Sequence, residues 1–440
     1  MPPFFRRTLI ATVLAAPLLA APAAAQHLST AEKVIGRTVD ADYDRSVALL
    51  EKLVDQNSGT LNLDGVTKVG ALMRAELEPL GFAVTWKPMD AVQRAGHLIA
   101  VHRGKPGTKT LLLIGHLDTV FEPSSPFQKF VRKGDLAEGP GAGDDKGGMV
   151  VIVSALRAMQ AAGTLRNANI EVHLTGDEEK SGSPHSIARA DLIAAGKRAD
   201  VALDFEGLVI DGGRDMGSIA RRSAIDWRIT ASGKTGHSSG IFTAEMGDGA
   251  VYELARILAA FRKELPETNL TFNTGVIAGG ARAAIDESGS AVAAGKTNII
   301  PATAIAIGDI RTLTPEQTAR VKAKMEAIVA AHAPGTDAKI AFGEGYPPMA
   351  PTDGNRALLA KLNGVNRDLG LAEMPALDPL KRGAGDVSFV AADVDSLAGL
   401  GPYSTGDHAP GETVDLQSIR RQAKRAAILM SRLSAERSTR

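Results

Sequence analysis

The 440-residue sequence contains no cysteine. Disulfide bonds and thiolate metal ligands are therefore both excluded. Any bound metal must use histidine and carboxylate side chains. This ligand set is typical of catalytic sites that keep room for water, rather than of closed structural zinc sites.

The sequence also lacks an excess of charge of either sign, because 50 Lys and Arg residues balance 50 Asp and Glu residues. Without excess positive charge, a nucleic acid or an anionic membrane surface is a disfavoured partner. We therefore expect a small-molecule substrate. The length predicts two or three domains.

Long apolar runs are missing after the N-terminus, so no stable membrane span is expected. The N-terminus itself is typical of a signal peptide, residues 1–25: Arg6 and Arg7 precede an apolar stretch, 9–19, and small residues 23–25 form a cleavage site. Pro17 interrupts the apolar stretch, which is too short for a comfortable membrane anchor. The sequence predicts export to the periplasm or medium, by either the general secretory or the twin-arginine route.

Residues 43 to about 203 alternate between helical and strand-like patterns, which predicts an α/β fold with a mainly parallel sheet and flanking helices. Helical spacing of apolar residues covers 43–56, 66–77 and 149–162. Strand-like segments cover 83–86, 97–101, 110–114, 170–175 and 201–203.

The pattern changes near residue 217. Segments 218–230 and 302–311 are strand-like, whereas 247–265 and 315–332 are helical, which predicts a separate α+β unit over 217–346. The segment 347–440 returns to the earlier pattern. We therefore predict a catalytic domain made of residues 26–216 and 347–440, with the α+β domain inserted between its two parts.

Side chains that can bind metal follow the predicted strands or precede a predicted helix. They are His116, Asp144, Glu178, Glu179 and Glu206, with His408 far downstream. In open α/β sheets the carboxyl edge of the strands is where ligands bind. Each motif alone has an ordinary explanation, since a His-x-Asp triplet is often incidental and a Glu-Glu pair is often solvated. Their joint occurrence favours a metal site.

A two-zinc arrangement accounts for this set. Asp144, on a glycine-rich turn, suits a bridge between the ions; His116 and Glu206 then complete one ion, and Glu179 and His408 complete the other. Two ions bring about +4, which three carboxylates and a hydroxide bring near zero. Co²⁺ or Mn²⁺ suit the same ligands as Zn²⁺.

Two further acidic residues have candidate roles. Asp118 can accept the second ring N–H of His116 and fix its tautomer. Glu178 is the candidate general base, which takes a proton from metal-bound water and returns it to the leaving amine. The glycine-rich loop 141–148 is not a phosphate-binding loop, because Asp145 and Gly147 flank Lys146 where that motif needs glycine and Ser or Thr.

At these residues the chain resembles the family of di-zinc exopeptidases and deacylases that includes glutamate carboxypeptidase, aminoacylase and succinyl-diaminopimelate desuccinylase. The matching motifs are 115–120, 141–148, 175–180, 204–206 and 399–401 leading to 407–410. The resemblance implies the ligands above, Asp118 as the residue that orients His116, and Glu178 as the base. It also implies a zinc-peptidase-like fold and a cis peptide between Asp144 and Asp145.

The same resemblance identifies the inserted domain as a lid, which often also forms a homodimer interface. His237, in the motif 233–239, is implied to reach a neighbouring active site and stabilise the tetrahedral oxyanion, although a turn residue is the alternative. Asn298 and Arg311 match positions that contact a substrate carboxylate; an intradomain salt bridge is the alternative for Arg311. Gly411 stands where an acidic residue is usual.

The expected protein is an exported zinc-dependent exopeptidase. It hydrolyses a peptide or N-acyl amide bond next to a free C-terminal carboxylate, as a glutamate carboxypeptidase does, through a metal-bridging hydroxide and Glu178. An N-acyl-amino-acid deacylase or an aminopeptidase with the same site is the alternative. A non-catalytic periplasmic binding protein is a further alternative, and the complete ligand set together with Glu178 argues against it.

Overall fold

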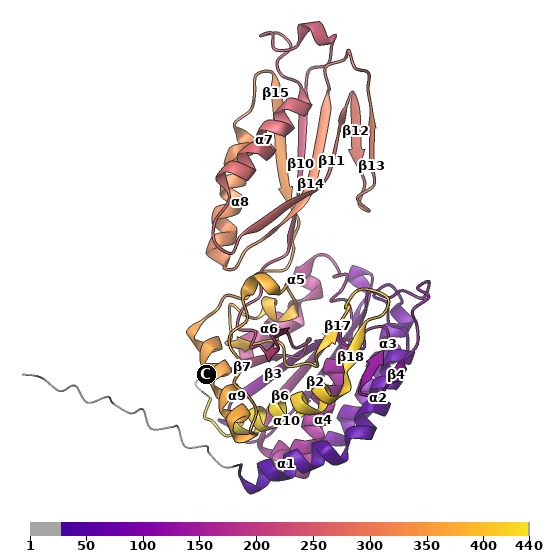
Figure 1. Ribbon diagram of the computed structural model, residues 1–440, viewed down its shortest axis with the longest axis vertical. Helices are drawn as coiled ribbons and strands as arrows, with labels where there is room; N and C mark the ends of the chain where they lie inside the picture. Colours follow the sequence, from indigo (N-terminus) through magenta and orange to yellow (C-terminus); the bar gives the residue numbers. More distant parts are fainter. Residues whose placement is uncertain (1–27, 439–440) are drawn as a thin grey trace, which may run out of the picture.

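The computed structural model describes residues 28–438, so the predicted signal peptide, residues 1–25, lies outside them. Figure 1 shows two units, each with its own sheet and helices, joined by two neighbouring stretches of chain. Over the described residues, no helix combines the length and apolar character needed to cross a membrane.

The larger unit is built on a six-stranded sheet in the order β1-β2-β6-β3-β7-β16. Its strands are β1 (Ala83–Met89), β2 (Arg94–His102), β3 (Thr110–His116), β6 (Asn169–Thr175), β7 (Val201–Asp204) and β16 (Ser396–Leu397). Strand β2 runs antiparallel to both of its neighbours, whereas β6, β3, β7 and β16 pair in parallel. The predicted α/β class with a mainly parallel sheet is confirmed.

Helices cover both faces of this sheet. They are α1 (Thr30–Ala41), α2 (Tyr43–Asp55), α3 (Leu63–Leu77), α4 (Lys146–Ala161), α5 (His185–Ala188), α6 (Ala190–Arg198), α9 (Asp353–Asp368) and α10 (Leu416–Leu433). In β3, Leu111 and Leu113 pack into the core that contains α4 and α10, while Leu112 and Ile114 pack into the core that contains α6. Burial on both faces explains why this strand is a continuous apolar run.

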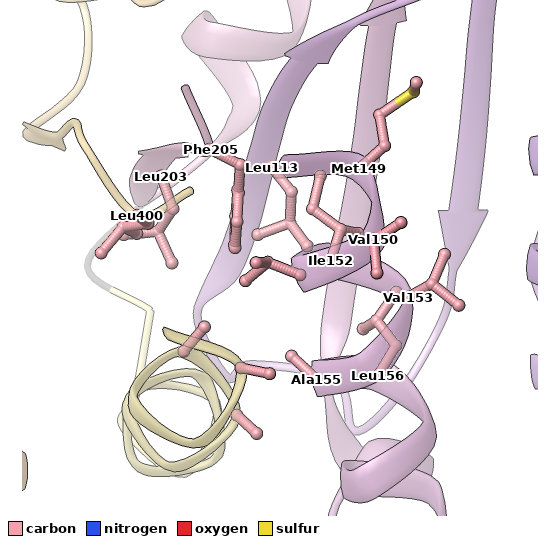
Figure 2. Close-up of a cluster of buried hydrophobic side chains, with 14 of the residues drawn as sticks. Leu113, Met149, Val150, Ile152, Val153, Ala155, Leu156, Leu203, Phe205 and Leu400 are labelled. Carbon is pink, nitrogen blue, oxygen red and sulfur yellow. The ribbon is translucent and has the colours of Figure 1, made fainter. Parts of the chain in front are cut away.

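Helix α4 is the centre of the larger core. Figure 2 shows its side chains packed against Leu113 and Leu203 of the sheet and against Phe205 and Leu400. The helix begins deep inside the protein because Gly148 has no side chain: a Cβ there would lie 2.1 Å from both Asp145 Oδ1 and Phe205 O. This close approach sets the Asp144 turn directly against the sheet.

The smaller unit has a four-stranded antiparallel sheet in the order β11-β14-β10-β15. Its elements are β10 (Ile225–Gly233), α7 (Ala250–Glu264), β11 (Thr271–Gly280), the hairpin β12 (Arg282–Ile285) and β13 (Ala291–Ala294), β14 (Thr303–Arg311), α8 (Pro315–Ala330) and β15 (Thr336–Phe342). Trp227, Ile257, Phe261 and Met325 belong to a core separate from that of the larger unit.

Short strands bring the C-terminal segment beside the Asp144 turn. In the order β17-β18-β5-β4, a small sheet joins β17 (Ser404–Thr405) and β18 (Thr413–Asp415) to β5 (Leu136–Glu138) and β4 (Val131–Lys133). Because β5 pairs with β18, the loop that follows β5 and the loop that precedes β18 lie side by side. A further pair, β8 (Ile210–Asp211) and β9 (Arg214–Asp215), follows β7.

The chain passes between the units twice, at residues 218–224 and 343–349, and we call these segments the outgoing and the return crossing. They pair with each other at Arg221 and Met349 and at Ala224 and Tyr346. The strand predicted over 218–230 therefore begins only at Ile225, because its first residues pair with the return crossing and the larger unit instead.

Candidate metal centre and active site

The candidate ligands come together at the carboxyl edge of the large sheet. His116 ends β3, Glu178 and Glu179 follow β6, and Glu206 follows β7. These three strands are parallel neighbours, so their carboxyl ends meet at one edge. Asp144 lies two residues before α4 at the same edge.

Asp144 stands between two histidines. Its Oδ1 is 3.0 Å from His116 Nε2, and its Oδ2 is 3.0 Å from His408 Nε2. Glu179 Oε2 lies 3.2 Å from the same His408 nitrogen. The distant His408 is thus in direct contact with Asp144, as a bridging arrangement requires.

A cation fits this cluster. Among the described residues, His116, Asp144 and Glu179 offer one ligand atom each, all within 4.8 Å of one another. Glu179 Oε1 is buried and has no hydrogen-bond partner, although a buried carboxylate oxygen ordinarily has one. Imidazole nitrogen and carboxylate oxygen are the donors that Zn²⁺ takes in catalytic sites.

The electrostatics point the same way. Burial raises the pKa of Glu179 to about 7, and burial together with the charge of Glu206 raises the pKa of Glu178 well above its usual value. Hydrogen bonds to Asp144 and Glu179 raise the pKa of His408 to about 11. The raised pKa values of the two glutamates reflect carboxylates crowded together in a buried place, and a bound cation would relieve this crowding.

Glu206 faces the same cavity but contacts arginines. The cavity has a volume of about 370 Å³, and Asp144, Glu178, Glu206 and His408 are among its lining residues. Glu206 Oε2 is 2.6 Å from Arg221 Nη1 and 3.5 Å from Arg382 Nη2. In this structure the Glu206 carboxylate is therefore directed to a cationic pair and does not contact either histidine through a hydrogen bond or ion pair.

Asp118 holds the loop that carries the two glutamates. Its carboxylate accepts hydrogen bonds from Glu178 N at 3.0 Å, from Glu179 N at 3.1 Å and from Thr60 Oγ1 at 2.6 Å. His116 Nδ1 lies 3.1 Å from the Asp118 carbonyl oxygen and 3.5 Å from its carboxylate. Asp118 thus contacts His116 mainly through its backbone, while its side chain positions Glu178.

Glu412 supports the Asp144 turn. Its carboxylate accepts hydrogen bonds from the backbone amides of Gly141, Gly143 and Asp144 at 3.0, 2.7 and 3.0 Å. The peptide between Asp144 and Asp145 is cis, as the resemblance implies. The acidic residue one position after Gly411 therefore reaches the metal-site loop.

The three candidate residues of the smaller unit lie apart from this cluster. His237 is exposed and contacts Ser239 Oγ through Nδ1 at 2.8 Å. Asn298 lies beside it, since its carbonyl accepts from Ser238 N. Arg311 forms an ion pair with Asp309 at 2.9 Å, and no described hydrogen bond or ion pair joins any of the three to the metal cluster.

Arg311 nevertheless lies near the cavity rim. A Cβ built on Gly383, one of the lining residues, would be 3.7 Å from Arg311 Nη1. Arg311 therefore forms the intradomain salt bridge with Asp309 and also lies near the cavity, where it could contact a substrate carboxylate.

Sequence reasoning missed the residues that surround the ligands: Asp204, Arg221, Arg382 and Glu412. Arg221 Nη1 bonds Asp204 Oδ2 at 3.0 Å, and Arg382 Nη1 donates to the Gly207 carbonyl at 2.6 Å. Asp204 lies in a matched motif and could have been singled out there. The arginines give no local signal, because only the tertiary fold brings them to the cavity.

Comparison with known proteins fits this geometry. Residues 112–432 match the model of Peptidase family M20/M25/M40. The chain belongs to this family.

Curated M20 relatives include carboxypeptidase G2 of Pseudomonas sp. (strain RS-16), which is 29% identical over 99% of this chain and 100% of its own length. Succinyl-diaminopimelate desuccinylase of Variovorax paradoxus is 26% identical over 85% of this chain and 94% of its own length. By its family membership, the chain is a metallohydrolase that acts on peptide or acyl amide bonds.

Solved structures share the fold. Aminopeptidase PepT of Bacillus cereus has a TM-score of 0.70 at 20% identity and covers 89% of this chain and 98% of its own. An M20 metallo-carboxypeptidase of Sulfolobus solfataricus has a TM-score of 0.63 at 16% identity, covering 88% of this chain and 99% of its own.

Proposed function

We propose that this M20 hydrolase is a two-zinc exopeptidase of the glutamate carboxypeptidase type, which cleaves a peptide or N-acyl amide bond next to a free C-terminal carboxylate. The position of Asp144 carries the proposal: each of its oxygens lies 3.0 Å from a different histidine. A carboxylate so placed suits two ions better than one.

The residues that would hold the ions are those of the cluster. Asp144 would be shared, with His116 and Glu206 on one ion and Glu179 and His408 on the other. Glu206 would turn from Arg221 to its ion. Bound zinc would supply Lewis acidity, which polarises a carbonyl group and makes water a better nucleophile. A solved M20 relative from Bacillus subtilis is a dinuclear metal-binding peptidase.

Glu178 is suited to move the proton. It lines the cavity beside Asp144, and its pKa is raised by burial and by Glu206, which favours a carboxylate that can accept a proton. Its backbone N–H is held by Asp118. Glu178 would accept the proton of the attacking water and donate it to the leaving amine.

The cavity suits an anionic substrate. Arg221, Lys381 and Arg382 line it, and Arg311 lies near its rim. Arg382 Nε is buried without a hydrogen-bond partner, so this guanidinium has unused donor capacity. A carboxylate that binds two guanidinium N–H groups would meet this need.

The smaller unit would act as a lid. Closure, in one chain or within a homodimer, would bring His237 toward the oxyanion and Asn298 and Arg311 toward the substrate carboxylate. Residues 1–25 would direct export, after which the mature enzyme would act in the periplasm or medium.

A substrate comparison tests the proposal. Purified protein loaded with Zn²⁺ is assayed on N-acyl-glutamate and dipeptide substrates with a free or an amidated C-terminus, alongside Glu178→Gln. We expect metal-dependent turnover that requires the free carboxylate, and a fall of about 10²- to 10⁴-fold in kcat for the variant. Full turnover of metal-loaded Glu178→Gln would rule out Glu178 as the base.

The desuccinylase relatives support a second candidate, an N-acyl-amino-acid deacylase with the same residues. Faster cleavage of acylated amino acids than of dipeptides would favour it. Cleavage from a free N-terminus with an amidated C-terminus would instead indicate an aminopeptidase.

A further inference from the structure

Tyr346, on the return crossing, reaches the backbone of the candidate base. Its hydroxyl donates a hydrogen bond to the Glu178 carbonyl at 2.8 Å and accepts one from Arg189 Nη2 at 3.0 Å. The residue belongs to the segment that connects β15 of the smaller unit to the larger unit. A side chain carried by an interdomain crossing thus touches the peptide group of an active-site glutamate.

The Glu178 residue is held at both ends of its backbone. Its N–H donates to Asp118 Oδ1, and its carbonyl accepts from Tyr346. Of these two contacts, Asp118 belongs to the larger unit beside β3, so only the Tyr346 contact depends on the crossing. The position of the carbonyl end is therefore set by where the crossing lies.

Arg189 anchors the other side of the tyrosine hydroxyl. It is fully buried, with Nη1 2.6 Å from Asp177 Oδ1 and Nε 2.8 Å from Asp386 Oδ1. Its Nη2 also donates to the Asp177 carbonyl at 3.1 Å. The hydroxyl thus lies between a rigid buried cation and the Glu178 carbonyl.

The return crossing is itself docked onto the same part of the larger unit. Glu344 Oε2 accepts from Ser183 Oγ at 2.9 Å and from His185 N at 3.1 Å. The Tyr346 ring packs against Phe389, with ring centroids 4.9 Å apart. These contacts fix the position of the return crossing on the larger unit.

The two crossings are hydrogen-bonded to each other. Ala224 of the outgoing crossing exchanges both backbone hydrogen bonds with Tyr346, at 3.1 and 2.8 Å. Gly345 has a φ of +60°, and a Cβ there would lie 2.4 Å from Ala224 O, so the pairing requires glycine. Because Tyr346 belongs to this pair, a movement of the smaller unit that shifts the pair would also shift the Tyr346 hydroxyl.

We propose that Tyr346 is a positioning residue that couples the orientation of the smaller unit to the backbone of Glu178. Closure of the lid would then position the backbone of Glu178 as well as cover the cavity. This inference rests on the proposed role of Glu178. It assigns no contact between Tyr346 and the substrate.

Tyr346→Phe tests it. The variant keeps the ring packing. Of the two N–H groups on Arg189 Nη2, one keeps the Asp177 carbonyl as acceptor and the other loses the tyrosine oxygen, so one buried donor is left unpaired. We expect amide hydrogen exchange in residues 178–182 of the metal-free protein to become about tenfold faster, as the loss of one hydrogen bond implies. In the zinc-loaded enzyme, kcat should fall about tenfold with KM within about twofold, as expected when a catalytic group is misplaced but binding is kept.

Tyr43→Phe is the matched control. It removes a phenolic hydroxyl from the same unit, where Gln417 Nε2 lies 3.4 Å away, and it should leave both readouts unchanged. Glu344→Ala loosens the crossing without removing the hydroxyl. It should speed exchange around Ser183 and His185 and, to a smaller extent than Tyr346→Phe, at residues 178–182, because the crossing shifts while the Glu178 contact remains.

Unchanged exchange at residues 178–182 in Tyr346→Phe would overturn the proposal, and so would unchanged exchange at these residues in Glu344→Ala. If the wild-type protein shows no metal-dependent hydrolysis, the proposed function fails. The exchange measurement needs neither metal nor substrate, so it still decides whether Tyr346 holds the Glu178 loop.

Discussion

Replacing Glu412 by glutamine should weaken metal binding although Glu412 is not a candidate ligand. Its Oε1 accepts from Gly143 N and Asp144 N, and its Oε2 accepts from Gly141 N. Glutamine can keep the two bonds to its carbonyl oxygen. The NH₂ group of the glutamine then faces the Gly141 N–H, and two donors cannot bond each other. Water cannot easily replace the lost acceptor, because the residue is only 1% exposed.

The magnitude follows from these contacts. A buried N–H left without an acceptor costs about 1–3 kcal/mol, and two charge-assisted bonds become neutral ones of about half the strength. If the displaced Asp144 turn costs metal binding about 2 kcal/mol of free energy, the Kd for the metal rises about 30-fold. Outer residues that orient ligands typically change metal affinity by about 10–100-fold, which is the same range.

Titration calorimetry with Zn²⁺ at fixed pH measures the effect, and Glu138→Gln is the matched control. Glu138 lies in β5, opposite Thr413 of β18, and pairs with Lys133 rather than with the Asp144 turn. The control should bind zinc as the wild type does. An unchanged affinity in Glu412→Gln would refute the argument that Glu412 holds the Asp144 turn in a binding geometry.

Three further outcomes are expected. Removal of metal with a chelator should abolish hydrolysis, and added Zn²⁺ should restore it and raise the unfolding temperature, because a ligand at 100 times its Kd stabilises the fold by about 2.7 kcal/mol. Arg382→Met should raise KM for substrates with a free carboxylate at least about tenfold, because one charge-assisted hydrogen bond to the substrate is lost. The inhibition constants of amidated analogues in competition assays should stay unchanged. Leu113→Ala should lower the denaturant midpoint by an amount equivalent to about 2–5 kcal/mol, because Leu113 is fully buried between the sheet and α4.

Sequence reasoning located the parts of the site that follow directly from local pattern. β3 is an apolar run that ends in His116, and β6 alternates apolar and polar residues up to Thr175. Both patterns predict strands, so the polar residues at their carboxyl ends could be assigned to one sheet edge. The glycines before Met149 mark a helix start that can approach the sheet closely, which explains why Asp144 could be placed there. In each case, one short stretch of sequence carries the whole signal.

His408 and Asp144 were both predicted as ligands, but the way in which they meet depends on a pairing that no local pattern encodes. His408 reaches Asp144 because β18 pairs with β5, and each of these strands has only three residues, too few to show a period of two. The strand-like pattern at 218–230 conceals the outgoing crossing, since extended backbone in a linker and in a sheet looks alike in sequence. Strands β11 to β13 were not predicted, and their exposed alternate residues and glycines weaken the apolar signal.

Ion pairs connect the carboxylates that the sequence pattern predicts to arginines that only the tertiary fold brings to the site. Locally encoded positions supply the carboxylates, whereas Arg221 and Arg382, which are brought in by the tertiary fold, supply the counter-charge at Glu206. A cation that drew Glu206 away would leave Arg221 with Asp204 as its partner, but would deprive Arg382 of its anion. A substrate carboxylate would then replace Glu206 at Arg382, so metal and anionic substrate should each strengthen the binding of the other, as thermodynamic linkage requires. The arginines that sequence alone could not place would thus connect the metal centre to substrate choice.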